Sequence, residues 1–130
     1  MKLRQSVSAS LVSGAVVLAA CDQSLPARQP SSGRVGVDLG TKAYGDCVAA
    51  AAQRLPVAGD TPGNIADGAI ASCKAARAAL LPKVRDFYLA GHKATPGYAA
   101  NVAEASVATL EDDIRTRAVI AVVERQNKGK

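Results

Sequence analysis

Apolar residues recur at intervals of three and four along three stretches of the chain, and this spacing matches one face of an α-helix. Residues 119–123 would pass for a strand in isolation, but no second strand-like run offers them a partner. We therefore expect an all-α fold, a small three-helix bundle over residues 43–125 with a polar tail at 126–130. The predicted helices cover about 43–55, 62–90 and 96–125.

Prolines mark the predicted ends of these helices. Pro56 stops the first helix, because proline lacks the amide donor and crowds the preceding turn. The Thr-Pro pairs at 61–62 and 95–96 each provide a threonine N-cap followed by proline at the first helical position. Pro82 falls inside the second helix, where we expect a kink; the alternative is a break, with Pro82 starting a separate turn.

Alanine dominates the predicted bundle. Residues 44–125 contain 21 alanines, and the whole chain has one Phe, three Tyr and no Trp. Alanine favours the helix and lets helices approach closely, but it buries little area. The core should therefore be thin, and a covalent link would supply a large share of the stability.

The N-terminus has the three parts of a secretion signal. Lys2 and Arg4 form a short positive start, an uncharged apolar run follows, and small residues precede Cys21. The apolar run from 7 to 20 has fourteen residues. A membrane-spanning helix needs roughly 20. We therefore expect residues 1–20 to be a cleaved signal peptide rather than a membrane anchor.

The end of this segment, Leu-Ala-Ala-Cys at 18–21, resembles the lipobox of bacterial lipoproteins. The resemblance covers residues 1–21 only, and it implies that Cys21 becomes the first mature residue and carries acyl chains such as palmitate. Asp22 resembles the signal for retention in the inner membrane, although the outer membrane stays open. The implied location is the bacterial cell envelope, facing the periplasm. The alternative is an ordinary signal peptide cleaved near Ala20, with Cys21 a spare thiol.

With Cys21 assigned to lipid, Cys47 and Cys73 remain as a pair in an oxidising compartment, so we expect a disulfide between them. Both lie on the apolar faces of the first two predicted helices. The 25 residues between them correspond to about 3 kcal/mol of stabilisation by loop closure. The spacing is neither Cys-x-x-Cys nor a zinc pattern, and we predict no metal site.

Between Cys21 and the first predicted helix the chain is rich in Pro, Ser, Gly and Gln and has no apolar periodicity. We expect residues 21–42 to form a lipid-anchored flexible tether, with 35–41 at most a short extended segment. Twenty flexible residues span roughly 25 Å, enough to lift the domain off the lipid headgroups.

The formal net charge is +5, which falls to +3 when Lys2 and Arg4 leave with the signal peptide. An exported chain does not meet the chromosome, and no aromatic residues are interleaved with the basic ones. Nucleic-acid binding is therefore not expected. A weak preference for anionic lipid or cell-wall polymer is compatible with the residual charge.

No group of residues predicts catalysis or a cofactor. The single histidine, His92, falls in a predicted loop after Gly91, where an exposed, non-catalytic role is expected. Glu111 and the two aspartates that follow it predict a solvated face, in which Glu111 pairs with Arg115 four residues on.

One group of side chains could still line a small groove, if the aromatic residues and the histidine gather at one end of the bundle. Aromatic residues at helical spacing are more often core. The possible binding residues are Tyr44, Phe87, Tyr88, His92 and Tyr98.

Together these features favour a non-catalytic cell-envelope lipoprotein, a tethered helical interaction module that contacts another envelope protein or a wall polymer. Its expected membrane contact is through acyl chains on Cys21, and no enzyme activity or cofactor is expected. The alternative is a small-ligand-binding module with a groove near the Pro82 kink, beside Lys83, Arg85 and His92.

Overall fold

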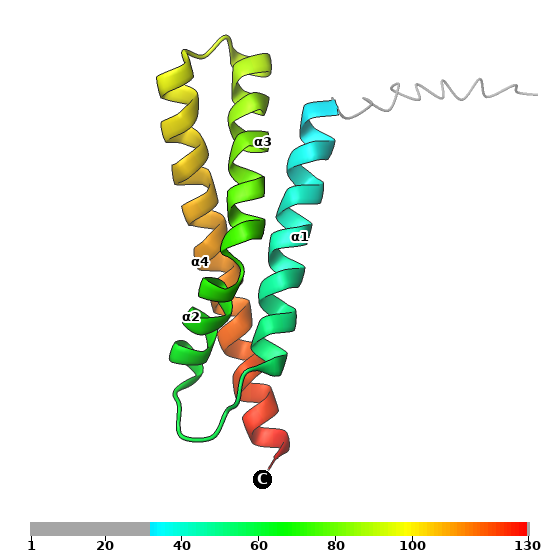
Figure 1. Cartoon of the computed structure of the whole chain (residues 1–130), viewed down its shortest axis with the longest axis vertical. Helices are drawn as coiled ribbons and strands as arrows, with labels where there is room; N and C mark the ends of the chain where they lie inside the picture. The colour runs from blue at the N-terminus through cyan, green and yellow to red at the C-terminus, as the bar shows by residue number, and fades with distance from the viewer. Residues whose placement is uncertain (1–31, 130) are drawn as a thin grey trace, which may run out of the picture.

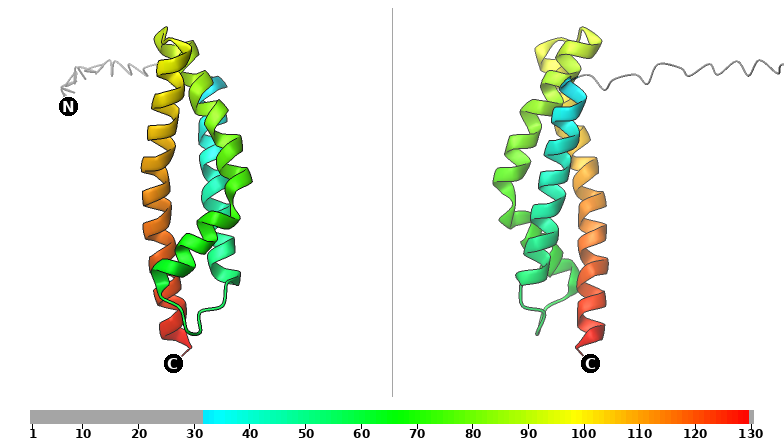
Figure 2. Two further views of the ribbon diagram at one scale, coloured as in Figure 1. Left: turned by 60° about the vertical axis from the view of Figure 1, so that its left-hand side comes forward. Right: turned by 90° about the vertical axis from the view of Figure 1, so that its right-hand side faces the viewer.

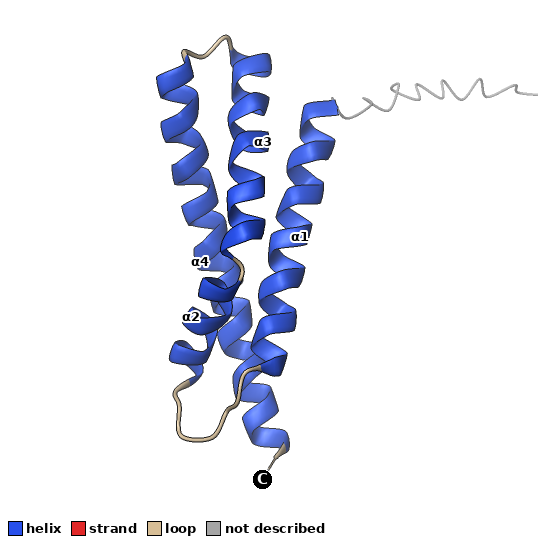
Figure 3. Cartoon of the chain, viewed as in Figure 1, coloured by secondary structure: helices blue, strands red, loops and turns tan. Residues whose placement is uncertain are grey.

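The computed structural model describes residues 32–129, which are all-helical with short connections (Figures 1 and 3). The predicted signal peptide, Cys21 and the tether as far as residue 31 lie outside the described residues. The all-α prediction is confirmed, but the count of three helices is wrong. The four helices are α1 (Ser32–Arg54), α2 (Pro62–Ser72), α3 (Lys74–His92) and α4 (Pro96–Lys128).

The helices form a long, narrow bundle (Figures 1 and 2). α1 runs down its length, α2 and α3 return one after the other, and α4 runs down again beside them. α2 packs on α1 and α4 in the lower half, and α3 packs on the same two helices in the upper half. Each level is therefore a three-helix layer, in which α1 and α4 point in the same direction.

α1 starts well before the predicted position. Residues 32–42, expected as the end of the flexible tether, are helical, so that part of the prediction is wrong. The helix forms there because it is packed: Val37 contacts the core, and Gly40 is buried against α3. A Cβ atom at Gly40 would lie 2.9 Å from Leu80 Cδ1 and 3.1 Å from Lys83 Cδ. Glycine therefore permits the close approach of α1 to α3.

The second predicted helix is divided at Cys73, where no break was predicted, and its second part, α3, continues through Pro82 without interruption. Cys73 has φ −106° and ψ 22°, outside the helical region, and joins the end of α2 to the start of α3. Pro82 lies on the exposed side of α3. There, water can satisfy the carbonyl that proline leaves without a donor.

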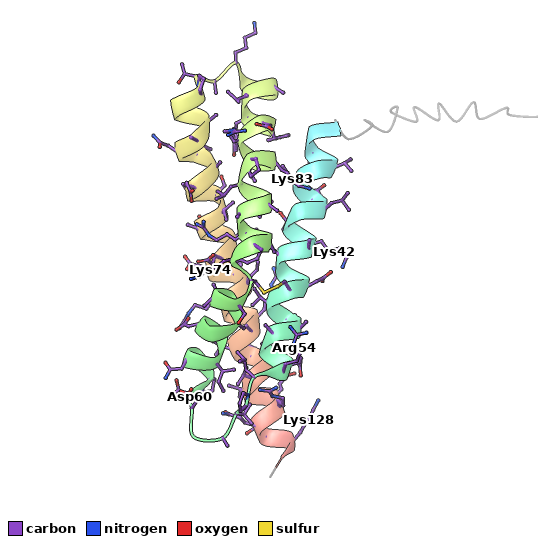
Figure 4. All side chains as sticks on the ribbon, viewed as in Figure 1. Lys42, Arg54, Asp60, Lys74, Lys83 and Lys128 are labelled. Atoms are coloured by element: carbon purple, nitrogen blue, oxygen red, sulfur yellow. A yellow bond between two sulfur atoms is a disulfide. The ribbon has the colours of Figure 1, made fainter. Side chains whose placement is uncertain are left out.

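The disulfide between Cys47 and Cys73 is confirmed, with an S–S distance of 2.05 Å and a Cα–Cα distance of 6.0 Å. It ties the middle of α1 to the break between α2 and α3, where Figure 4 shows its yellow sulfur bond. The helix break thus coincides with the point at which the returning chain is covalently attached to α1.

Both predicted threonine caps are confirmed. Thr61 Oγ1 accepts a hydrogen bond from Asn64 N at 3.2 Å, and Thr95 Oγ1 accepts one from Tyr98 N at 3.4 Å. Proline follows each threonine at the first helical position. Within residues 32–129 no helix is long and apolar enough to cross a membrane.

The core is a thin line of small side chains along the bundle axis, as the composition predicts. Its largest fully buried members are one tyrosine, one leucine and several valines. Alanines from three helices fill the remaining positions. The largest fully buried side chains are Tyr44, Leu80, Val48, Val107, Val122 and Cys73.

Candidate functional site

A polar cluster crosses the bundle just above the disulfide, formed by Tyr44 of α1, Arg77 of α3, and Glu104 and Glu111 of α4. The Tyr44 hydroxyl donates to Glu111 Oε2 at 2.6 Å, and Arg77 Nε donates to the same oxygen at 3.1 Å. Arg77 Nη2 also donates to Glu104 Oε2 at 3.2 Å. One carboxylate therefore joins three helices at a single level of the bundle.

The environment of Tyr44 keeps its hydroxyl protonated. The side chain is fully buried, and this burial, together with the hydrogen bond to Glu111 and the negative charge of that carboxylate, raises the pKa of Tyr44 well above its ordinary value of 10.0. A protonated hydroxyl donating to a carboxylate is a stable structural contact. It cannot act as a base at neutral pH.

The cluster corrects the prediction for Glu111. Its side chain is partly buried and accepts hydrogen bonds from Tyr44 and Arg77, while Arg115 pairs instead with Asp67 of α2, with Nε to Oδ1 at 2.6 Å. The two aspartates after Glu111 are exposed, as predicted. The sequence did contain a signal for Glu111, since it lies four residues after Val107 and three before Ile114, the spacing of the apolar stripe of this helix.

The structure does not gather the five possible binding residues into one groove. Tyr44 is buried in the polar cluster, whereas Phe87 and Tyr88 lie on α3 with ring centroids 5.6 Å apart in an edge-to-face arrangement. Tyr98 is 60% exposed on the first turn of α4. His92 ends α3 rather than lying in a loop. Its side chain lies outside the described residues.

A small pocket of about 180 Å³ does lie beside Pro82, between α3 and α4. Leu81, Arg85 and Glu104 contribute to its walls. Arg85 is also paired with Asp86, at 2.9 Å between Nη2 and Oδ1. Ligand sites for drug-sized molecules occupy roughly 300–1,000 Å³, so this pocket is small for the predicted ligand-binding role.

A groove with mainly apolar walls lies on another side of the molecule, between the parallel helices α1 and α4. It has a volume of about 620 Å³ and extends along α1 from Thr41 to Gln53. Neither α2 nor α3 contributes a residue to it. No feature of the sequence predicts this groove. The residues that give it its apolar, narrow walls are Gly45, Ala49 and Ala50 of α1 and Leu110, Ala118 and Ala121 of α4.

Large apolar side chains that remain exposed are confined to the same two helices. In the described part of the chain, α1 contributes Val35 and Leu39, and α4 contributes Tyr98, Ile120 and Val123. α2 and α3 contribute none within residues 32–129. In the described part of the chain, the large exposed apolar side chains are thus limited to two of the four helices.

The lower end of the bundle is closed by the last turns of α4. Arg125 donates through Nη1 to the carbonyl oxygen of Gln53 and through Nη2 to that of Leu55, the latter at 2.6 Å. These carbonyls belong to the C-terminal end of α1 and the residue after it, where helical acceptors lack partners of their own. Arg125 therefore holds the end of α1 against α4.

Within residues 32–129 no three His, Cys, Asp or Glu side chains are arranged to hold a metal ion. The chain matches no protein-family model, no curated protein and no solved structure.

Proposed function

We propose that this chain is a non-catalytic lipoprotein of the bacterial cell envelope, a helical interaction module held at a membrane by acyl chains on Cys21. Its partner is another envelope protein or a wall polymer, and it needs no cofactor. The observation that carries the proposal is the restriction of large exposed apolar side chains to two of the four helices. These lie on α1 and α4 alone in the described part of the chain.

An apolar pair on α4 suits the partner contact. Ile120 and Val123 are 54% and 39% exposed and lie three residues apart, on the same side of the helix. Exposed apolar side chains that cluster on one face, bordered by polar groups, are typical of interaction sites. Here Arg117 and Glu124 flank the pair in sequence and are exposed.

The tether agrees with this role. Because α1 already begins at Ser32, the chain between Cys21 and α1 can span at most about 35 Å when extended. The bundle then works close to the membrane surface that holds Cys21. Asp22 favours the inner membrane, facing the periplasm.

The ligand-binding alternative is less well supported. The pocket beside Pro82 measures about 180 Å³, and a small-molecule site usually needs roughly 300 Å³ or more. Of the aromatic residues expected to line such a groove, Phe87 and Tyr88 share the wall of a pocket of about 170 Å³, which is also small, whereas Tyr44 is buried in the polar cluster and Tyr98 is exposed on α4.

Photo-crosslinking in intact cells tests the proposed partner contact. A photoreactive amino acid at position 120 of the full chain should capture an envelope component, and the same probe at the exposed position 78 of α3 should not. Equal capture from both positions, or none from either, would refute the α4 contact.

The membrane tether has a separate test. Cys21→Ser should move the protein from the membrane fraction to the soluble fraction of the envelope. An unchanged membrane fraction would contradict the acyl anchor.

A further inference from the structure

The outward face of α1 carries a stripe of residues spaced alternately by four and three, the repeat of a helix that packs against another helix along a seam. All six are exposed, and the last four also line the groove against α4. The first two, a valine and a leucine, are 41% and 60% exposed. The stripe consists of Val35, Leu39, Lys42, Asp46, Ala49 and Gln53.

This stripe is complementary to itself when a second α1 runs antiparallel to the first. With a twofold axis level with Tyr44, each large apolar residue meets a small or uncharged one, and each charge meets the opposite charge. In that register Val35 lies opposite the partner's Gln53, Leu39 opposite the partner's Ala49, and Lys42 opposite the partner's Asp46, with each pair occurring twice.

Charge favours this register. Lys42 and Asp46 form an exposed ion pair within α1, with side chains 72% and 65% accessible and Nζ 2.6 Å from Oδ2. Figure 4 shows Lys42 directed away from the bundle. Across the twofold axis the two pairs would form a ring of four charges with alternating sign. Such an arrangement selects one register and disfavours others.

The groove supplies space for the partner's apolar residues. Since Tyr44 is hydrogen-bonded to Glu111 and α1 is parallel to α4, Ala49 and Ala118 lie within about one helical turn of the same level. The partner's Leu39 would enter between these two alanines. Gly45, where an added Cβ would meet no atom within 4 Å, lets the two α1 helices approach closely near the axis.

The direction of the helices also suits an antiparallel partner. α1 and α4 point the same way on this face, so their dipoles are aligned. A helix running in the opposite direction between them offsets that alignment. It occupies the position that a fourth helix takes in an antiparallel four-helix bundle.

We infer that the α1 face and the α1–α4 groove form a self-association site, at which two copies of this chain pair antiparallel about a twofold axis level with Tyr44. The inference does not depend on the acyl anchor or on the partner contact at Ile120, and it leaves the outer face of α4 free.

The mass of the full chain tests this inference, measured by sedimentation equilibrium in a density-matched detergent. The unmodified chain should be a dimer. Leu39→Glu and Asp46→Lys should each raise the dimer dissociation constant at least roughly tenfold. Ala78→Glu, a change at an exposed position of α3, should leave it unchanged. The exchange Lys42→Asp with Asp46→Lys should restore dimerisation, because it restores opposite charges across the axis.

Engineered cysteines test the register. Leu39→Cys combined with Ala49→Cys should give a disulfide-linked dimer on mild oxidation. The two positions are ten residues apart on one rigid helix, too far to link within a chain. Val35→Cys combined with Ala49→Cys, offset by about one turn in this register, should link poorly. A monomer at every concentration, or a dimer insensitive to Leu39→Glu, would overturn the inference, as would equal linking of both cysteine pairs.

Discussion

Substitution of Gly40 tests the packing of α1 on α3, the contact that makes residues 32–42 helical. A Cβ atom at this position would lie 2.9 Å from Cδ1 of Leu80, a fully buried side chain. Gly36, one turn earlier in α1, would meet no atom within 4 Å. Alanine at the two positions therefore differs only in what the added methyl group contacts.

The magnitude follows from two opposing effects. Replacing a helical glycine by alanine stabilises the helix by about 0.5–1 kcal/mol, and Gly36→Ala should gain that amount. Gly40→Ala should gain the same amount and lose about 1–3 kcal/mol from overpacking against Leu80. The two variants should differ by about 1–3 kcal/mol in free energy of unfolding. Each kcal/mol corresponds to roughly 4–8 °C in Tm for a domain of this size.

Thermal and guanidinium unfolding followed by circular dichroism measures this difference. A second arm checks its cause: Leu80→Val removes the clashing methyl group, so Gly40→Ala combined with Leu80→Val should cost less than the two changes added together. If Gly40→Ala is as stable as Gly36→Ala, the first turns of α1 do not pack on α3 as described.

Three further predictions follow from the links between helices. Cys73→Ser should lower the free energy of unfolding by about 3 kcal/mol, measured by guanidinium titration, and an unchanged midpoint would exclude a stabilising role for the disulfide. Tyr44→Phe should cost about 1 kcal/mol near neutral pH, whereas Tyr98→Phe should have no effect. Because the folded-state pKa of Tyr44 is raised above its ordinary 10.0, its contribution is complete below pH 10 and lost as pH rises, so Tyr44→Phe should flatten the fall in stability above pH 10. Arg125→Ala should lower the free energy of unfolding by about 1.5–3 kcal/mol, because the hydrogen bonds to two backbone carbonyls are lost. Lys128→Ala, at an exposed position, should leave it unchanged in the same guanidinium titration. Equal values for the two variants would show that Arg125 does not hold the end of α1 against α4.

Local signals in the sequence were sufficient for several features. The threonine caps at Thr61 and Thr95 act through hydrogen bonds to backbone amides three residues on. They depend on neighbours in sequence, which makes them predictable. Pro56 ends the first helix for the same local reason, since α1 stops at Arg54. The cysteine pair followed from counting, once one of three cysteines was assigned to lipid.

The N-terminal extent of α1 depended on packing instead. Two valines and two glycines between Val35 and Gly40 favour the helix weakly, so the segment resembles a tether when considered alone. The segment is helical because Val37 packs against the core and because Gly40, which has no side chain, allows α3 to lie close to α1. No local rule predicts that a helix distant in sequence packs against these residues.

Neither the polar cluster nor the groove could be predicted from the spacing of residues in the sequence. Tyr44 and Glu111 are 67 residues apart, and only the bundle places them 2.6 Å from each other. The groove between α1 and α4 exists because α2 and α3 cover the opposite sides of both helices. Helical periodicity identifies which face is apolar, but it does not show which apolar faces remain uncovered.

By itself the sequence determined the helical class, the caps, the sulfur pair and the expectation of an acylated N-terminus, because each depends on neighbouring residues or on residue type. Tertiary structure alone decided that the returning helix breaks at Cys73, although alanine and lysine around it favour a continuous helix. The physical reason is tertiary packing, because α2 and α3 both have to pack against α1 and α4. A covalent link to α1 at that point outweighs the small local preference for an unbroken helix.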